Sequence, residues 1–388
     1  FTDLRPINIE DLLGRESVIP DSSLLWSKIK GRVVLVTGAG GTIGSELCRQ
    51  IGDFAPARLI LVDNSEFNLY QIEAELRAAQ SSGVTIVPIL GDVCNGLQMR
   101  QVMTQYMVDT VYHAAAYKHV PIVEENAIVG VANNVLGTLR TAEAARDAQV
   151  RDFVLVSTDK AVRPTSVMGA SKRMAELVLQ AIHEDSDPDT RTQFCMVRFG
   201  NVLGSSGSAV PKFTEQIEAG GPVTVTHPEV TRFFMTIHEA ANLVIQAGSL
   251  AQGGDVFVLD MGQSVRIIDL ATRMIELSGS TVRSETNPSG DIEIKFTGLR
   301  PGEKLYEELL IEGDLEATDH PKVMRSAESF LLWEDLSKIL QRLEAAIDRR
   351  DEETVLQILQ QNVAGYRGRS TISGISTSPT TLPDKRSV

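Results

Sequence analysis

The chain has 388 residues, of which 43% are hydrophobic and 23% charged, a composition typical of a globular protein with one large or two ordinary domains. The formal net charge of -14 argues against a nucleic-acid-binding protein, because such proteins present basic surfaces. The three cysteines lie far apart and the six histidines are scattered, so we expect reduced thiols and no metal site.

The first 30 residues carry two short helical candidates, near residues 9–13 and 24–29, and we treat them as a leader to the folded region. No apolar run approaches the length of a membrane span, and no signal peptide is visible. Because the first residue is Phe rather than Met, we expect the chain to be a fragment whose upstream part is missing.

A glycine-rich turn lies between a strand predicted over residues 32–37 and a helix predicted over residues 43–51. Its three glycines suit a dinucleotide site: one permits the tight turn, one lets the backbone approach a pyrophosphate, and one allows the helix to pack closely on the strand. The helix N-terminus would face the phosphates. The spacing is G-x-x-G-x-x-G rather than the commoner G-x-G-x-x-G. The predicted contacts are Gly38, Gly41, Thr42, Ile43 and Gly44.

The second predicted strand, residues 58–63, ends in Asp63, about 20 residues beyond the last of these glycines. A carboxylate at this place can accept hydrogen bonds from the ribose hydroxyls of NAD. It would repel the 2′-phosphate of NADP, and Asn64 adds no compensating positive charge, so we expect NAD as the cofactor. Ser65 is included in this predicted cofactor site. The same residues also allow another interpretation, in which Asp63 caps the following helix.

A helix over residues 67–79 and strands over 85–90 and 110–113 continue the alternation, which is typical of an α/β protein with a Rossmann-type, doubly wound parallel sheet. The third strand ends where the adenine of a bound dinucleotide would lie. The fourth runs into small residues that would let the backbone approach the dinucleotide. A tight strand–helix turn is the alternative there. The candidate cofactor contacts in this part are Asp92, Val93, Ala114, Ala115 and Ala116.

Polar residues follow a buried strand predicted over residues 153–156, and the carboxyl ends of strands line the ligand crevice in such sheets. A hydroxyl, a carboxylate and an ammonium come in succession. A helix then begins near Val167, and it places a methionine and a lysine four residues apart on one face. The candidate catalytic residues are Thr158, Asp159, Lys160, Met168 and Lys172. The alternative is a helix N-cap beside a solvated lysine.

Beyond about residue 200 the regular alternation is lost. We therefore predict a Rossmann domain over 31–200 and a smaller substrate-binding lobe over 201–330, with room for strand exchange between them. Two amphipathic helices over 331–365 and a disordered Ser/Thr/Pro-rich tail over 366–388 complete the chain. The candidate substrate ligands are Lys118, His119, Asn201, Lys212, Thr226, Arg232, Arg300 and Glu303. Taken singly, Lys212, Arg232 and Arg300 each fit a solvated surface cation better than a ligand, because most Arg and Lys residues are exposed.

Six stretches together resemble the extended short-chain dehydrogenase/reductases, and more closely their CapD-type polysaccharide-biosynthesis group, the UDP-N-acetylglucosamine 4,6-dehydratases. They are VTGAGGTIGSEL (36–47), HAAAYKHVP (113–121), STDKA (157–161), RFGNVLGS (198–205), TRFFMTI (231–237) and GLRPGEK (298–304). These stretches span most of the first 330 residues in the expected order.

The resemblance implies an NAD-dependent dehydration of a UDP-N-acetylhexosamine. Hydride passes from carbon 4 to NAD, water is lost across carbons 5 and 6, and the hydride returns to carbon 6. It further implies Asp159 as the acid for the leaving hydroxyl, Lys160 as the base at carbon 5 and Thr158 as a sugar ligand. Lys172 would bind the nicotinamide ribose, and Asn133 would join the cofactor site. We expect desolvation and the positive charges of Lys172 and the nicotinamide to lower the pKa of Lys160.

One position departs from the superfamily pattern, because the Tyr-x-x-x-Lys pair is replaced here by Met168-x-x-x-Lys172. Methionine cannot accept the carbon-4 hydroxyl proton. A subgroup of membrane-tethered dehydratases that retain the carbon-5 configuration resembles this chain in carrying Met there, and residues 4–15 are similar to the segment before their catalytic domain. The resemblance therefore implies a missing N-terminal membrane region, a location at the cytoplasmic face of the bacterial inner membrane, and a homo-oligomer.

Three other functions are carried as alternatives. A nucleotide-sugar 4-epimerase shares the hydride step but does not need an acid–base pair to eliminate water. A dehydratase that inverts carbon 5 belongs to a group that keeps the tyrosine. The third is an NAD-binding regulatory protein that has lost catalysis. The presence of Thr158, Asp159, Lys160 and Lys172 around Met168 argues against a general loss of the catalytic residues.

Overall fold

The computed structural model describes residues 22–79, 83–188, 192–308 and 315–368. The helix predicted near residues 9–13 and the predicted disordered tail beyond residue 368 lie outside these ranges. None of the helices within them is long and apolar enough to cross a membrane. Membrane attachment through a preceding region stays a prediction.

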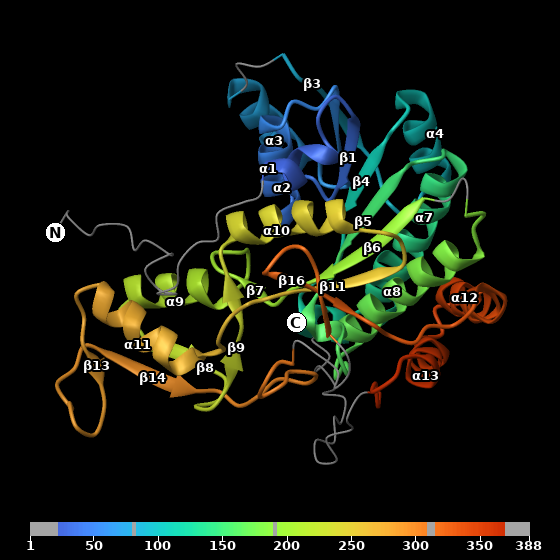
Figure 1. The fold of residues 1–388 in the computed structure, drawn as a ribbon. Coiled ribbons are helices and arrows are strands. Elements are labelled where there is room, and N and C mark those ends of the chain that lie inside the picture. The colour runs from blue at the N-terminus through green and yellow to red at the C-terminus, as the bar shows by residue number, and fades with distance from the viewer. Residues whose placement is uncertain (1–21, 80–82, 189–191, 309–314, 369–388) are drawn as a thin grey trace, which may run out of the picture.

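A nine-stranded sheet forms the centre of the molecule (Figure 1). Its parallel strands are, in spatial order, β11 (Asp255–Leu259), β6 (Gln193–Arg198), β5 (Asp152–Val156), β4 (Thr110–His113), β1 (Val33–Thr37), β2 (Arg58–Asp63) and β3 (Thr85–Leu90). The antiparallel strands β16 (Val323–Ser326) and β15 (Leu315–Ala317) extend the sheet beyond β11. The order reverses at β1, so the carboxyl ends of β1 and β4 border the ligand crevice of a doubly wound sheet. The predicted fold class is confirmed.

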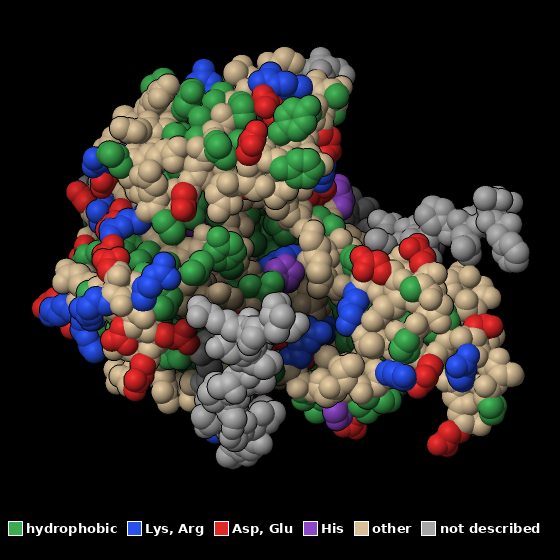
Figure 2. All heavy atoms as spheres, turned by 180° about the vertical axis from the view of Figure 1, so that it is seen from behind, with side chains coloured by type: hydrophobic (Ala, Val, Ile, Leu, Met, Phe, Trp, Pro, Cys, Tyr) green, Lys and Arg blue, Asp and Glu red, His purple; other side chains and the backbone are tan. Residues whose placement is uncertain are grey.

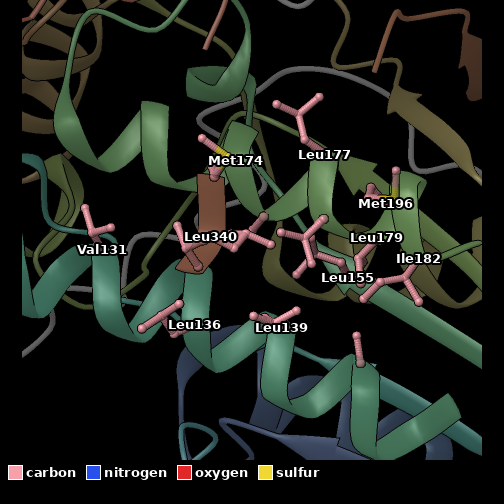
Figure 3. Packing of buried hydrophobic residues seen from close by; sticks show 14 of the residues in the cluster. Val131, Leu136, Leu139, Leu155, Met174, Leu177, Leu179, Ile182, Met196 and Leu340 are labelled. Carbon is pink, nitrogen blue, oxygen red and sulfur yellow. The ribbon is translucent and has the colours of Figure 1, made fainter. Parts of the chain in front are cut away.

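Helices cover both faces of this sheet because its central strands are continuous apolar runs that must be buried on both sides. One face carries α1 (Ser22–Ser27), α2 (Thr42–Asp53), α3 (Glu66–Ala79) and α10 (Ile237–Leu250), joined by one apolar cluster. The other face carries α4 (Gly96–Tyr106), α7 (Gly137–Asp147) and α8 (Val167–Asp185). Figure 3 shows Leu139, Leu155 and Leu179 packed together in this second cluster.

Helix α8 is buried from Val167 to His183, because the sheet lies on one side of it and two C-terminal helices lie on the other. These are α12 (Trp333–Asp348) and α13 (Glu352–Asn362), which the sequence predicted as an amphipathic pair. Leu340 of α12 lies close to Met174 of α8 (Figure 3). Tyr366, where the predicted tail begins, is buried in the same cluster.

Between β4 and α7 the chain forms α5 (Val120–Glu125), α6 (Ala127–Val131) and a π-helical turn, Ala132–Leu136. Helices α5 and α6 both contact α8. The end of β4 is thus connected to the helix that carries Met168 and Lys172.

A smaller lobe lies beside the carboxyl ends of the strands (Figure 1). It contains α9 (Ala209–Glu218), α11 (Ile267–Leu277) and a three-stranded sheet of β13 (Val282–Arg283), β14 (Ile292–Phe296) and β8 (Val223–Val225). Two short pairs join it: β9 (Thr231–Arg232) with β12 (Val265–Arg266), and β7 (Asn201–Val202) with β10 (Phe234–Met235). Residues 201–330 contribute to both lobes, because α10, β11, β15 and β16 belong to the main sheet layer.

Candidate active site

Two adjoining cavities open where the main sheet meets the smaller lobe, and Figure 2 shows this hollow with basic side chains beside it. The larger has a volume of about 630 Å³ and is lined by the glycine-rich turn, the end of β4, α5, α8 and the segment after β5. The smaller has about 280 Å³ and is lined partly by residues 300–307. Both are lined by Lys118, His119, Lys160, Asn201, Ser205 and Ser208.

The glycine-rich turn forms a cradle that side chains would fill. A Cβ on Gly44 would lie 1.9 Å from the carbonyl oxygen of Gly38, and one on Gly38, whose φ is +63°, would lie 2.8 Å from the backbone of Ala115. Gly41, the N-cap of α2, offers no side-chain cap, so the first N–H groups of the helix are left for a ligand. This arrangement fits a dinucleotide pyrophosphate.

A third cavity of about 70 Å³ lies on the other side of this turn, beside Asp63. It is lined by Gly38, Asp63, Asn64, Val93, Ala115, Ala116 and Asn133, among others. Ala114, Thr42 and Ile43 line the larger cavity instead. The exposed Asp92, whose carboxylate accepts a hydrogen bond from the Cys94 N–H at 2.9 Å, is not among the lining residues of either cavity.

Asp63 hydrogen-bonds the glycine-rich turn and also lines the third cavity. Its carboxylate accepts hydrogen bonds from the Gly40 N–H at 2.9 Å and from the Ser65 N–H at 2.8 Å. Asp63 does not cap α3, because the helix starts at Glu66 and it is Ser65 Oγ that accepts from the Asn68 N–H, at 3.4 Å. Each carboxylate oxygen of Asp63 keeps a second lone pair for a cofactor.

Thr158, Asp159 and Lys160 form one hydrogen-bonded group at the end of β5. Asp159 Oδ1 accepts from Thr158 Oγ1 at 2.9 Å and from Lys160 Nζ at 3.0 Å. Lys160 Nζ also donates to Asn201 Oδ1 at 3.2 Å. Thr158 and Lys160 line the larger cavity, whereas Asp159 is 0% exposed and lies behind them. A Cβ on Gly200 would come within 2.9 Å of Asp159 Oδ2, so the glycine makes room for the carboxylate.

The expected pKa shift of Lys160 is wrong in direction. Desolvation does lower the pKa of this lysine, but the negative charges of Asp159 and Glu307 outweigh desolvation, and the pKa is raised. The sequence prediction considered Lys172 and could not include Glu307, which lies far away along the chain. Lys160 is therefore protonated at neutral pH in this structure.

Met168 and Lys172 both line the larger cavity, and they are 2% and 4% exposed. Helix α8 begins directly before them, with Ser166 Oγ accepting from the Gly169 N–H at 3.1 Å as its N-cap. Desolvation lowers the pKa of Lys172 to about 8, against the opposing charge of Glu176.

A buried ion network lies beneath these residues. Glu176 accepts from Ser157 Oγ at 2.6 Å, from Arg198 Nε at 2.8 Å and from Arg173 Nη1 at 3.0 Å. Glu328 also pairs with both arginines. The network connects the ends of β5 and β6 with α8. It was not predicted from the sequence.

The smaller cavity is lined by the cations Lys118, Lys160, Arg232, Arg300 and Lys304 and by the carboxylates of Glu303 and Glu307. Arg232 is buried and held by Glu303, whose Oε1 lies 3.1 Å from Arg232 Nη2 and 3.1 Å from Thr226 Oγ1. This excess of cations suits a diphosphate.

Two of the predicted substrate ligands do not line either of these cavities. Lys212 is exposed, and its pKa is lowered by desolvation and by the charge of Arg300. Thr226 contacts the cavity only through Glu303. In contrast, Lys304 and Glu307 line the smaller cavity and were missed, because ordinary Lys and Glu residues in a turn-rich segment carry no sequence signal. Among the described residues, no group of three His, Cys, Asp or Glu side chains is arranged to hold a metal ion.

Residues 34–328 match the family model described as "Polysaccharide biosynthesis protein". The chain is 47% identical over 357 residues to the capsular polysaccharide biosynthesis protein CapD of Staphylococcus aureus, which covers 92% of this chain but 57% of that relative's length. It is 33% identical over 290 residues to a UDP-glucose 4-epimerase of Rickettsia canadensis, covering 73% and 79% of the two chains.

Solved structures give a consistent result. The structure of Pen from Bacillus thuringiensis matches with a TM-score of 0.69 and 33% identity, over 76% of this chain and 87% of that chain. The dTDP-glucose 4,6-dehydratase DesIV of Streptomyces venezuelae, solved with NAD, shares the fold at a TM-score of 0.60 and 22% identity, over 71% and 87% of the two chains.

Proposed function

Because the chain belongs to the polysaccharide biosynthesis protein family, we propose that it is an NAD-dependent nucleotide-sugar 4,6-dehydratase. Its substrate would be a UDP-N-acetylhexosamine, in the first place UDP-N-acetylglucosamine, and its product the UDP-4-keto-6-deoxy sugar. The observation that carries the proposal is the position of Lys160. It is paired with Asp159 at the wall of a cavity that has a dinucleotide cradle on one side and a cluster of cations on the other.

The proposed cofactor site uses the glycine cradle for the pyrophosphate, Asp63 for the adenosine ribose and Lys172 for the nicotinamide ribose. NAD, once bound, supplies the acceptor for the hydride of carbon 4 and its donor to carbon 6. Asp63 favours NAD over NADP because its carboxylate would repel a 2′-phosphate. The DesIV structure named above, which has the same fold, was solved with NAD.

The proposed substrate site uses the smaller cavity for the diphosphate. Lys118, Arg232 and Arg300 reach it from the end of β4, from β9 and from the loop after β14. Arg232 is pre-oriented by Glu303, which reduces the conformational entropy lost on binding. With the diphosphate there, the hexose lies in the direction of Thr158 and Lys160, which line the adjoining cavity.

Elimination of water needs a base at carbon 5 and an acid at the carbon-6 hydroxyl. Oxidation of carbon 4 to a ketone acidifies the carbon-5 proton, which neutral Lys160 would remove. Asp159 would act through the hydroxyl of Thr158, 2.9 Å from its Oδ1, because Asp159 itself does not line the cavity. By this path Asp159 can accept the carbon-4 hydroxyl proton and later deliver it to the leaving hydroxyl, so no tyrosine is needed at position 168.

The test is incubation with UDP-N-acetylglucosamine and NAD, followed by mass spectrometry and NMR of the product. A dehydratase gives a product that has lost one water and has kept its carbon-5 configuration. Asp159→Asn should abolish turnover while NAD binding is retained, and full activity in this variant would remove the proposed role of Asp159.

A 4-epimerase is the second candidate, favoured by the 33% identity to a protein named UDP-glucose 4-epimerase. It would return a product of unchanged mass. A product inverted at carbon 5 would instead indicate the other class of dehydratase. Binding of NAD without turnover of any UDP-sugar would indicate a regulatory protein.

A further inference from the structure

Glu307 is a buried carboxylate that approaches Lys160 from the loop after β14. It is 8% exposed and lines the smaller cavity. Its Oε1 lies 3.8 Å from Lys160 Nζ and 3.8 Å from Arg232 Nε. Its Oε2 is buried and makes no hydrogen bond with any described residue. A carboxylate so deeply buried is normally hydrogen-bonded through both oxygens, so its geometry needs an explanation.

The two carboxylates beside Lys160 are not equivalent. Asp159 Oδ1 accepts two hydrogen bonds, although its Oδ2, like Oε2 of Glu307, is buried without a partner among the described residues. Glu307 has only ion pairs at 3.8 Å, beyond hydrogen-bond length, and burial without donors favours its protonated form. Of the two, Glu307 is therefore the better acceptor for a proton from Lys160.

We propose that Glu307 is a positioning residue that takes the proton which Lys160 must release before it can act as a base. This inference rests on the proposed dehydration. The ammonium of Lys160 passes one proton to the Glu307 carboxylate, leaving a neutral amine and a carboxylic acid. The amine then takes the carbon-5 proton and becomes an ammonium again. When hydride arrives at carbon 6, this ammonium returns a proton to carbon 5, and the acid on Glu307 returns its proton to the amine.

The charges around the pair are compatible with this exchange. Desolvation raises the pKa of Glu307 and the charge of Asp159 raises it further, while Lys160, Arg232 and Lys304 act in the opposite direction; the pKa is raised overall. The separation of 3.8 Å between Lys160 Nζ and Glu307 Oε1 can be closed by a small side-chain rotation or one water molecule.

The experiment measures exchange of the carbon-5 proton with deuterated solvent as a function of pH, in the NAD-loaded enzyme with UDP-N-acetylglucosamine. In the wild type Glu307 takes the proton that frees the Lys160 amine, so the exchange rate should be nearly independent of pH around neutrality. In Glu307→Gln the proton must go to solvent. Exchange should then fall about 100-fold at neutral pH and recover about tenfold for each unit by which the pH is raised.

Two variants serve as controls. Glu308→Gln removes a neighbouring carboxylate that pairs with Arg163 and Lys304, and it should keep the flat profile of the wild type. Glu307→Asp keeps a carboxylate and should also keep the flat profile, at a rate within about tenfold of the wild type. If Glu307→Gln does not fold, Glu307→Asp decides: a profile that rises with pH in this variant overturns the proposal.

Other results would also contradict the proposal. A flat profile in Glu307→Gln, or faster exchange than in the wild type, would mean that Glu307 takes no proton from Lys160. Equal losses of hydride transfer and of carbon-5 exchange would indicate a purely structural role.

A wild-type enzyme that neither exchanges the carbon-5 proton nor releases water would instead refute the proposed dehydration. The protonation of Glu307 can then still be measured by urea unfolding of the cofactor-free protein. Because the folded-state pKa of Glu307 is raised, the wild type should lose stability as the pH rises through it, and Glu307→Gln should not. Parallel pH profiles of the two proteins would overturn the inference independently of any turnover.

Discussion

Arg198 and Glu176 form an ion pair that is fully buried directly beneath the candidate catalytic residues. Arg198 Nε lies 2.8 Å from Glu176 Oε1, and the two side chains are 1% and 0% exposed. Ser157, the residue before Thr158, donates to the same carboxylate at 2.6 Å. The pair thus connects the strand that ends at the site with the helix that carries Lys172, and it holds their separation.

Glu176→Gln should destabilise the protein by about 3 to 5 kcal/mol, because it leaves a buried guanidinium without its full counter-charge. Desolvation alone would raise the pKa of Glu176, but Arg198 and Arg173 hold it at about 2. The wild type should therefore lose stability as the pH falls from about 4.3 towards 2, and the variant should not. Urea unfolding measures both effects.

The matched control is Glu344→Gln, which removes one of two carboxylates that pair with the half-exposed Arg140 and should change stability by less than about 1 kcal/mol. If the two variants lose the same amount of stability, the buried network of Glu176 stabilises the fold no more than a surface ion pair does.

Lys172→Met should stabilise the cofactor-free protein while it abolishes turnover. The pKa of Lys172 is about 8 in the folded chain and about 10.4 when unfolded, so the unfolded state binds the proton more tightly. Stability of the wild type should rise between these two pH values and stay constant below them. At pH 7 the variant should be more stable by up to about 3 kcal/mol.

Unfolding of both proteins in urea at neutral and alkaline pH tests this expectation. Lys338→Met, at an exposed position on α12, should change stability by less than about 0.5 kcal/mol. Equal stability of Lys172→Met and the wild type at pH 7 would mean that the amine is better solvated than its burial indicates.

The parts of the fold that the sequence predicted are those with strong local signals. Each strand of the first half is a run of apolar residues bounded by a turn, and helix α8 begins at Val167, as the sequence predicted. Residues 193–202 form two strands, β6 and then β7, which pairs with β10. The break comes at Gly200, where the chain turns closely past Asp159.

The site was less predictable because its geometry depends on residues distant in the sequence. Thr158, Lys160, Met168 and Lys172 come from one segment and do line one cavity. Glu307 and Glu328 approach from far along the chain. Glu307 adds to the effect of Asp159 in raising the pKa of Lys160, and Glu328 pairs with Arg198. No local pattern indicates such contacts.

Gly44→Ala should weaken NAD binding at least tenfold, which corresponds to about 1.4 kcal/mol. The new Cβ would lie 1.9 Å from the backbone oxygen of Gly38, so the turn that forms the phosphate cradle must shift. Gly96→Ala is the control, because its Cβ would meet only the side chain of Arg140, at 3.3 Å. Titration of NAD by calorimetry measures both, and equal affinities would show that the cradle does not bind the cofactor.

Met168→Tyr tests whether the missing tyrosine limits the enzyme. Met168 lines the larger cavity, so a phenol can extend into open space, and we expect the variant to fold with little change in melting temperature. Its turnover should not rise by more than about threefold, because in this chain the carbon-4 hydroxyl proton has a path through Thr158 to Asp159. Met168→Leu, which also lacks a proton acceptor, should keep the wild-type rate.

The double variant Met168→Tyr/Asp159→Asn makes this test sharper. A tyrosine can accept the carbon-4 proton, but it lies on α8 rather than in the hydrogen-bonded group of Asp159, so it cannot replace the acid at carbon 6. The double variant should therefore regain hydride transfer, seen as NADH absorbance, without regaining loss of water. Recovery of full dehydration would show that Asp159 has no role at the leaving hydroxyl, and that the proton path through Thr158 is not the one the enzyme uses.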